Sequence, residues 1–490
     1  VSGGNNTAIG NAALGANTSG ADNTVVGSNA GDDITTGSKN TLIGRNAGGA
    51  ISTNERTVAI GSSCISGGNI GFAVGIGDEV LASGSLSGNN HVAIGFRASK
   101  NTTSGVNTAV GFRCLQGNTT GSGNSAVGFD AMIDNTTGGN NTAVGNLALT
   151  NNTTASNNTA VGNQALELNT TGANNVAVGA YALDANTTGN QSTALGASAL
   201  GASTTSSRNT AVGYIALANN TTGDDNVGIG KSALQENTTG TRNTAVGANA
   251  LDANTTTSDH TAVGYDALGA NTTGQNNTAV GSYALDANTD GDNLVAVGQS
   301  ALTGNTTGGY STACGMAALQ TISTAGNNTA VGYVALQMSN AADNTAVGYK
   351  ALQDTTTGAN NTAVGSSALK ENTTGVNNVA VGSLCLDANT TGFHNTAVGL
   401  QALSANNTAS YNTAVGTNSL LVNTTGHSNS AVGANALDAN TTGSFNTATG
   451  FQALTSNETA NACSAFGYNA VRNNTTGANN TGVGYQALEA

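Results

Sequence analysis

The chain has 490 residues, of which 8% are charged and 4% aromatic, and it contains no proline and no tryptophan. Its net charge is −14 with only 12 Lys and Arg, and no basic cluster could neutralise phosphates, so we expect no nucleic-acid partner. No apolar run approaches the ~20 residues of a membrane span, so we expect no membrane insertion.

One phrase of 17 residues, G-x-x-A-L-x-x-N-T-T-G-x-N-N-T-A-V, runs through the sequence, and its opening glycine occurs 29 times from Gly10 to Gly484. A fixed period in this range indicates a repeat architecture, in which a thin core becomes continuous when repeats stack. We therefore predict a single continuous array of about 29 coils over residues 1–490. Because the chain begins and ends inside a phrase, we expect a longer parent polypeptide.

The first element of each phrase is x-x-A-L, directly after the glycine. Its leucine, as in Leu149, Leu166 and Leu251, is the largest apolar residue of the phrase, so we predict that it fills the core. The two residues before the alanine vary freely, for example Tyr265-Asp266, which is typical of positions that face solvent.

The second element is Asn-Thr-Thr-Gly, as in Asn186-Thr187-Thr188-Gly189. These residues favour a turn, in which we expect the glycine to supply a positive φ. A further asparagine pair, such as Asn140-Asn141, leads to the next phrase. Identical asparagines at one position of stacked coils can form hydrogen-bonded ladders, and the absence of proline agrees with stacking.

The third element, Thr-Ala-Val, predicts a short strand because two β-branched positions flank one residue. Val replaces the Thr at Val58, and Ile replaces the Val at Ile43, so we predict that this face lies inside. The middle residue stays small, apart from Val25 and Leu42, which suggests contact with another chain. The valines expected in line inside are Val144, Val161 and Val178, and the alanines expected at the contact are Ala143, Ala160 and Ala177.

One coil of a β-solenoid per phrase fits these three elements, because Gly, Asn and β-branched residues are poor helix formers. Two stretches depart from the period, so we expect irregular coils near residues 62–110 and 333–348. The glycine steps are 14 from Gly61 to Gly75, 20 from Gly75 to Gly95, and 16 from Gly332 to Gly348. The segment Ile76–Asn90 contains an unusual Asp-Glu-Val-Leu. It is either a tolerated loop change or a protrusion that contacts a ligand.

Residues that could carry chemistry are scattered. No phosphate-binding glycine motif and no calcium-binding nonapeptide is present. We therefore predict no catalytic residue, no metal site and no cofactor, and thus no enzyme. The four histidines are His91, His260, His394 and His427, and the recurring aspartates are Asp184, Asp252, Asp286, Asp387 and Asp438.

Five cysteines lack the paired spacing of a disulfide framework, so we expect small buried thiols. They are Cys64, Cys114, Cys314, Cys385 and Cys463. Glycosylation sequons such as Asn237-Thr238-Thr239 and Asn360-Asn361-Thr362 follow from the turn sequence and matter only if the chain passes through a eukaryotic secretory pathway.

The segment Asn90-His91-Val92-Ala93-Ile94-Gly95 resembles the head motif of trimeric autotransporter adhesins. The longer phrase, as in residues 480–488, is similar to repeats in tail-fibre and tailspike proteins of phages and large viruses. The adhesin resemblance implies a left-handed parallel β-roll in a side-by-side homotrimer, although this chain has a longer period.

We therefore expect a structural fibre segment for surface attachment, located outside the cell on a virion or cell surface. Its expected partners are copies of itself and a cell-surface receptor, with glycans among the candidates. One alternative is an ice-binding solenoid, which an inward-facing strand threonine would disfavour. Another is a carbohydrate-cleaving tailspike, which would need paired carboxylates in a groove, and no such cluster is visible.

Overall fold

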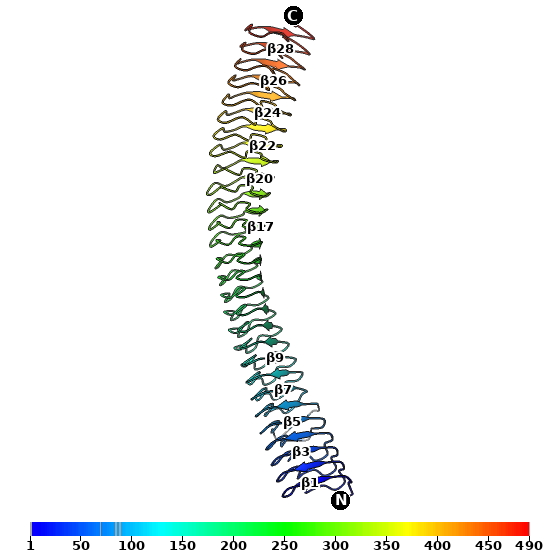
Figure 1. Ribbon diagram of the computed structural model, residues 1–490. Coiled ribbons are helices and arrows are strands. Elements are labelled where there is room, and N and C mark those ends of the chain that lie inside the picture. The colour runs from blue at the N-terminus through cyan, green and yellow to red at the C-terminus, as the bar shows by residue number, and fades with distance from the viewer. Residues whose placement is uncertain (1, 69, 84–85, 88–89, 490) are drawn as a thin grey trace. The chain divides into compact units, whose positions relative to one another are not determined.

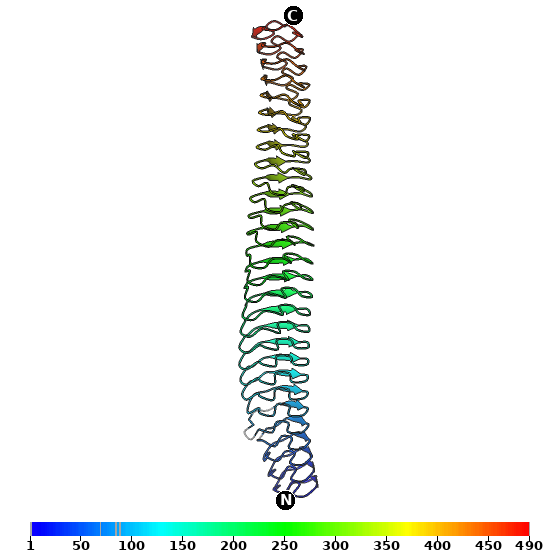
Figure 2. The same cartoon turned by 90° about the vertical axis from the view of Figure 1, so that its left-hand side faces the viewer.

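The computed structural model describes residues 2–68, 70–83, 86–87 and 90–489. It divides into two units, residues 1–243 and 244–490, which are treated separately below. Each regular element among the described residues is a three-residue strand, and no helix is found among them. In each unit successive strands stack one above the next (Figure 1; Figure 2). The predicted all-β parallel solenoid is thus confirmed.

The strands of the first unit are β1 Thr7–Ile9, β2 Thr24–Val26, β3 Thr41–Ile43, β4 Val58–Ile60, β5 Val74–Ile76, β6 Val92–Ile94, β7 Thr108–Val110, β8 Ser125–Val127, β9 Thr142–Val144, β10 Thr159–Val161, β11 Val176–Val178, β12 Thr193–Leu195, β13 Thr210–Val212 and β14 Val227–Ile229.

The strands of the second unit are β15 Thr244–Val246, β16 Thr261–Val263, β17 Thr278–Val280, β18 Val295–Val297, β19 Thr312–Cys314, β20 Thr329–Val331, β21 Thr345–Val347, β22 Thr362–Val364, β23 Val379–Val381, β24 Thr396–Val398, β25 Thr413–Val415, β26 Ser430–Val432, β27 Thr447–Thr449, β28 Ser464–Phe466 and β29 Thr481–Val483.

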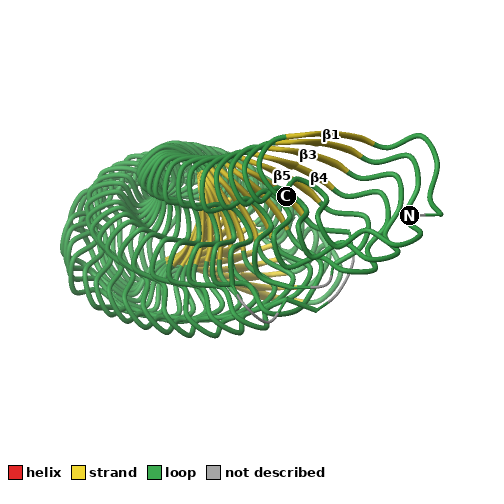
Figure 3. Cartoon of the chain, turned by 90° about the horizontal axis from the view of Figure 1, so that it is seen from below, coloured by secondary structure: helices red, strands yellow, loops and turns green. Residues whose placement is uncertain are grey.

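Neighbouring strands within each unit pair in parallel and in register. In β9 and β10, Thr142 lies opposite Thr159 and Val144 opposite Val161, so one coil takes 17 residues. The strands occupy one side of each coil, as β1, β3, β4 and β5 show in Figure 3, and turns complete the circuit. The prediction of one coil per phrase is therefore confirmed. Whether all 490 residues form one array stays a prediction.

In the irregular stretch after Gly61, the coil lengths depart less from 17 residues than the spacing of the glycines suggested. Gly75 is the middle residue of β5, and the glycine that follows this strand is Gly77, with φ 135°. The steps are therefore 16 from Gly61 to Gly77 and 18 from Gly77 to Gly95. The supposedly unusual Asp-Glu-Val-Leu is an ordinary x-x-A-L element, because Val80 and Leu81 are fully buried.

The one extra residue of the 18-residue step lies between Leu81 and Asn90 in the sequence. Of the predicted protrusion over 76–90, residues 84–85 and 88–89 lie outside the described residues. The short coil between Gly332 and Gly348 is an ordinary turn deletion. Its strands β20 and β21 still pair in register, with Thr329 opposite Thr345.

The core contains the predicted leucines, but the strand faces are the reverse of the prediction. Leu149, Leu166 and Leu251 are fully buried. The middle alanine of the strand, for example Ala143, is also fully buried, whereas Val144 is 38% exposed. The valines are in line but outside, and the alanines face the interior of their own coil. A contact between chains through the alanines is therefore wrong.

Space inside the coil explains why the middle residue is small. A Cβ built on Gly228, the middle residue of β14, would lie only 3.2 Å from Cγ of Leu217 in the same coil. The larger Leu42 fits because glycine replaces leucine at Gly31 and Gly48. A Cβ on either glycine would lie within 2.8 Å of Leu42 Cδ1. Leu42 thus occupies space that the core leucines fill in other coils.

Two rows of buried asparagines connect the coils, which confirms the predicted ladders. In the first ladder, formed by Asn-Thr-Thr-Gly, Asn152 Nδ2 donates to Asn135 Oδ1 of the preceding coil at 2.7 Å and to the Ala155 carbonyl at 3.1 Å. In the second ladder, just before the strand, the Asn141 N–H donates to Asn124 Oδ1 at 3.0 Å, and its Nδ2 donates to the Ala155 carbonyl at 2.9 Å.

Positive φ values occur at positions that the sequence did not suggest. The turn glycines of Asn-Thr-Thr-Gly, such as Gly189, are not among the residues with positive φ, whereas the phrase glycine is, as in Gly145 at 142°. A Cβ on Gly145 would lie 2.3 Å from the Gly162 carbonyl oxygen of the next coil. The core leucines are also left-handed, with Leu166 at φ 53°. The Leu166 N–H donates to the Ala182 carbonyl of the next coil at 3.0 Å, which helps to hold this costly conformation.

Candidate functional surface

The most regular outer surface is the strand face, which we define as the first and third residues of every strand. The first residue is mostly half-buried Thr or Val, and the third is a more exposed Val or Ile, such as Val297 at 37%. None of the strands that the structure describes carries a charged residue, although the chain has a net charge of −14. The strand face is therefore a neutral, largely apolar strip in each unit.

A row of aromatic side chains lies next to the strand face, at the position directly after the phrase glycine. Phe96, Phe112 and Phe129 of three successive coils stack with ring centroids 5.3 and 5.1 Å apart. Phe451, Tyr468 and Tyr485 stack likewise at 5.4 and 5.3 Å. Phe or Tyr recurs at this phrase position in the sequence. The prediction that the position varies freely and faces solvent did not take this recurrence into account. These stacks join neighbouring coils and widen the apolar strip.

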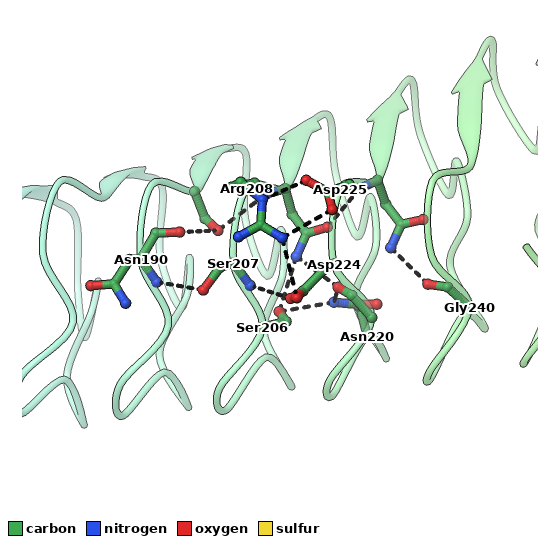
Figure 4. Close-up of polar contacts among 12 residues, drawn as sticks. Asn190, Ser206, Ser207, Arg208, Asn220, Asp224, Asp225 and Gly240 are labelled. Carbon is green, nitrogen blue, oxygen red and sulfur yellow. Dashed lines mark hydrogen bonds and ion pairs between the residues drawn. The ribbon is translucent and has the colours of Figure 1, made fainter. Parts of the chain in front are cut away.

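The turn before the strand carries exposed ionic and polar contacts (Figure 4). Arg208 Nε donates to Asp225 Oδ1 at 2.6 Å, and this bond lowers the pKa of the Asp225 carboxyl. The Ser207 N–H donates to Asp224 Oδ1 at 2.8 Å, and the Asn190 N–H to Ser207 Oγ at 3.0 Å. These contacts on the exposed turn link one coil to the next. Exposed ion pairs of this kind contribute little to stability.

Ser206 repairs a gap in the first asparagine ladder. Ser203 replaces the ladder asparagine in this coil, and Ser206 replaces the turn glycine. Ser206 Oγ lies 2.6 Å from Ser203 Oγ and accepts hydrogen bonds from Asn209 and Asn220 Nδ2 at 3.0 Å each. The paired change keeps the neighbours bonded, although Asn186 Oδ1 in the preceding coil is left without a partner.

The histidines are not brought together. His91 and His260 are buried in the second asparagine ladder, in place of asparagine. His260 Nδ1 accepts the Asn277 N–H at 3.2 Å, and burial lowers its pKa to about 4. His394 and His427 are exposed on turns, where His394 stacks on Tyr411 and His427 makes an edge-on contact with Phe445. Within the described part of the chain, no group of three His, Cys, Asp or Glu could hold a metal ion.

Four of the five cysteines are buried as predicted, but Cys314 is exposed because it occupies the outward valine position of β19. Burial raises the pKa of the Cys64 and Cys385 thiols to about 12, which makes them poor nucleophiles. No disulfide links the described cysteines. The aspartates Asp184, Asp286, Asp387 and Asp438 are half-buried in separate coils, and desolvation raises their pKa values.

Neither a family model nor a curated protein matches this chain. Over the residues that the structure describes, no helix is long and apolar enough to cross a membrane. The features that remain for function are therefore the strand face, the aromatic row and the exposed turns.

Proposed function

We propose that this chain is a structural fibre segment that serves surface attachment outside the cell. The observation that supports this most is the bonding from coil to coil within each unit, by the strands throughout and by the two asparagine ladders over most coils. Such bonding turns a 17-residue phrase into an object whose length grows with every repeat. The free variation of the exposed turns leaves room for a receptor contact, for which glycans are candidates.

Length measurements test the fibre proposal. Removal of residues 129–230 deletes 102 residues, or six phrases of 17, and joins equivalent positions. We expect the maximum dimension from small-angle X-ray scattering to fall by about 29 Å, because stacked strands are ~4.8 Å apart. An unchanged dimension would contradict the proposal. Retention of the fluorescently labelled chain on host or target cells tests attachment separately.

We also propose that copies associate as a parallel homotrimer of left-handed β-rolls, now through the strand face rather than the alanines. An uncharged apolar strip lets copies of like net charge approach where repulsion is weakest. A strip three residues wide adds roughly 50 Å² per coil, so some 28 coils offer roughly 1,400 Å² per copy, above the ~800 Å² of a typical partner surface.

Cys314 gives a direct test of this association, because it lies on the strand face between Val297 and Val331. Mild oxidation should produce a covalent dimer on a non-reducing gel, and Cys314→Ser should abolish it. Val297→Glu should weaken association in light scattering. A monomer at all concentrations would remove the trimer and leave the fibre proposal standing.

The second candidate function is ice binding. The main argument against it was that the strand threonines were expected to face inward, and in the structure these threonines face outward. Regular rows of Thr and Val are the kind of surface that such proteins present. The strands of the second unit, however, turn progressively from β17 to β28 in Figure 1, which limits the flat area to a few coils. Thermal hysteresis that disappears in Thr278→Lys would favour this function over the fibre.

A further inference from the structure

Most Asn-x-Thr glycosylation sequons of the chain are of two kinds, Asn-Thr-Thr in the turn and Asn-Asn-Thr directly before a strand, and the fold treats their asparagines in opposite ways. In the Asn-Thr-Thr kind the asparagine belongs to the first ladder. Asn135 is fully buried, and its Nδ2 donates to Asn118 Oδ1 at 2.8 Å and to the Gly138 carbonyl at 3.1 Å. Both amide hydrogens are therefore used inside the coil.

In the Asn-Asn-Thr kind that directly precedes a strand, the first asparagine is on the surface, whereas Asn406 of Asn406-Asn407-Thr408 is a fully buried first-ladder residue. Asn140 and Asn360 are exposed left-handed residues with φ 58° and 59°, and the following asparagine enters the second ladder instead. Asn157 Nδ2 is also exposed and makes only a 3.3 Å bond to Asn174 Oδ1, between two exposed side chains. The threonine two residues on, for example Thr142, begins the strand and points outward.

N-linked glycosylation forms a bond from the asparagine Nδ2 to the anomeric carbon of an activated sugar. The bond from that carbon to a diphosphate leaving group breaks, and one amide proton is lost. The product is a bulky polar adduct that must remain in solvent. At Asn135 the reaction would remove one of two ladder donors and place a sugar in the core. At Asn140 it would add the sugar to open surface.

We infer that N-glycosylation at the Asn-Thr-Thr sequons and folding of this chain exclude each other, and that the acceptor sites of the folded chain are the exposed Asn-Asn-Thr asparagines. A glycosylating enzyme that meets the unfolded chain modifies both kinds and prevents the first ladder from closing. The native fold therefore forms where such enzymes do not reach the unfolded chain. This inference does not depend on the proposed fibre function.

The site preference can be tested with chain produced in a bacterial host without N-glycosylation. The folded chain is incubated with a soluble asparagine N-glycosyltransferase and UDP-glucose, and occupied sites are mapped by mass spectrometry. Proteolytic peptides of the same chain serve as the unfolded control. We expect sugar on both kinds of sequon in the peptides, but in the folded chain on Asn140, Asn157 and Asn360 and not on Asn135.

Two matched variants identify each site without changing the ladder asparagine. Thr137→Ala removes the Asn135 sequon at an exposed residue, and Thr142→Val removes the Asn140 sequon with a residue that the chain itself uses at Val176. In the folded chain only Thr142→Val should eliminate an occupied site. Equal occupancy of Asn135 and Asn140 in folded protein would overturn the inference, as would no occupancy at Asn140 when the peptides are modified there.

Secretion through a glycosylating host tests the exclusion from folding. We expect most of the chain to be retained or protease-sensitive, and an inhibitor of N-glycosylation to increase the yield of soluble, protease-resistant protein several-fold. Soluble, protease-resistant chain that carries a sugar on Asn135 or Asn152 would overturn the inference.

Discussion

At the scale of single residues, asparagine occupies three recurring environments. Two of them are the buried ladders: in the first, Nδ2 donates to the preceding coil and to a carbonyl of its own turn, and in the second, Nδ2 donates to the next coil while Oδ1 accepts a backbone N–H from it. The third is the exposed left-handed position, as at Asn157 with φ 64°, which asparagine tolerates better than most residues. Composition alone would count these residues together, but only the buried ones should matter greatly for stability.

Asn152→Ala is expected to destabilise its region by at least ~2 kcal/mol, because buried donors and acceptors lose their partners. Asn135 Oδ1 and the Ala155 carbonyl lose a donor, and Asn169 Nδ2 loses its acceptor at 3.0 Å. Hydrogen exchange at amides of the adjoining coils measures the effect. Thr154→Ala, at an exposed position of the same turn, is the control and should change stability by less than ~0.5 kcal/mol. Similar exchange in both variants would mean that the ladder contributes little.

His260 should make the second unit sensitive to acid. Its folded pKa, lowered from 6.5 to about 4, lies below its unfolded value. The stabilising contribution is therefore present above pH 6.5 and is lost as the pH falls towards 4. His260→Asn restores the usual ladder residue and should raise the melting temperature relative to the parent at pH 4.5 more than at pH 8. The exposed His427→Asn serves as control, and equal shifts at both pH values would contradict this assignment.

At the scale of one coil, the fold depends on a small set of residues that fit around the leucine. Leu251→Asp should cost more than ~3 kcal/mol locally, because it places an unpaired charge in the core. Tyr265→Asn, at a position that is 46% exposed, should cost less than ~1 kcal/mol. Thermal unfolding compares the two, and similar losses would show that the leucine position is not the core.

The sequence predicted the coil well, but not which residues of the strand face its interior. Strand positions, coil length, the core leucine and the asparagine ladders all followed from the phrase. The strand faces did not, because Thr and Val are β-branched and suit either side of a strand. The small alanine was attributed to a second chain, whereas its own coil lacks space: the larger Leu42 occurs where Gly31 replaces the core leucine of the same coil. The strand face was therefore missed as the candidate surface, and Cys314 was wrongly expected to be buried.

At the scale of the whole molecule, charge and the neutral strand face should control association together. Copies that each carry −14 repel one another, while the strand face contributes no charge. Salt shortens the repulsion to about 8 Å at physiological ionic strength, so association should increase from 0.01 to 0.5 M NaCl. Sedimentation velocity measures the change. Dissociation at high salt would show instead that ion pairs hold the copies together. Val297→Glu, which places a charge on the strand face, is the matched control.

The near-identity of the coils has a consequence for how the gene can change. Loss or duplication of one whole phrase leaves every remaining coil with an equivalent neighbour above and below, whereas most other changes must be absorbed in a turn, as in the 16-residue step to Gly348. Recombination between repeats can therefore change the length of the stack in increments of ~4.8 Å without changing the fold of the coils. The irregular steps around Gly77 and Gly348 act as landmarks, because a chain that paired one phrase out of register would meet them at the wrong coil.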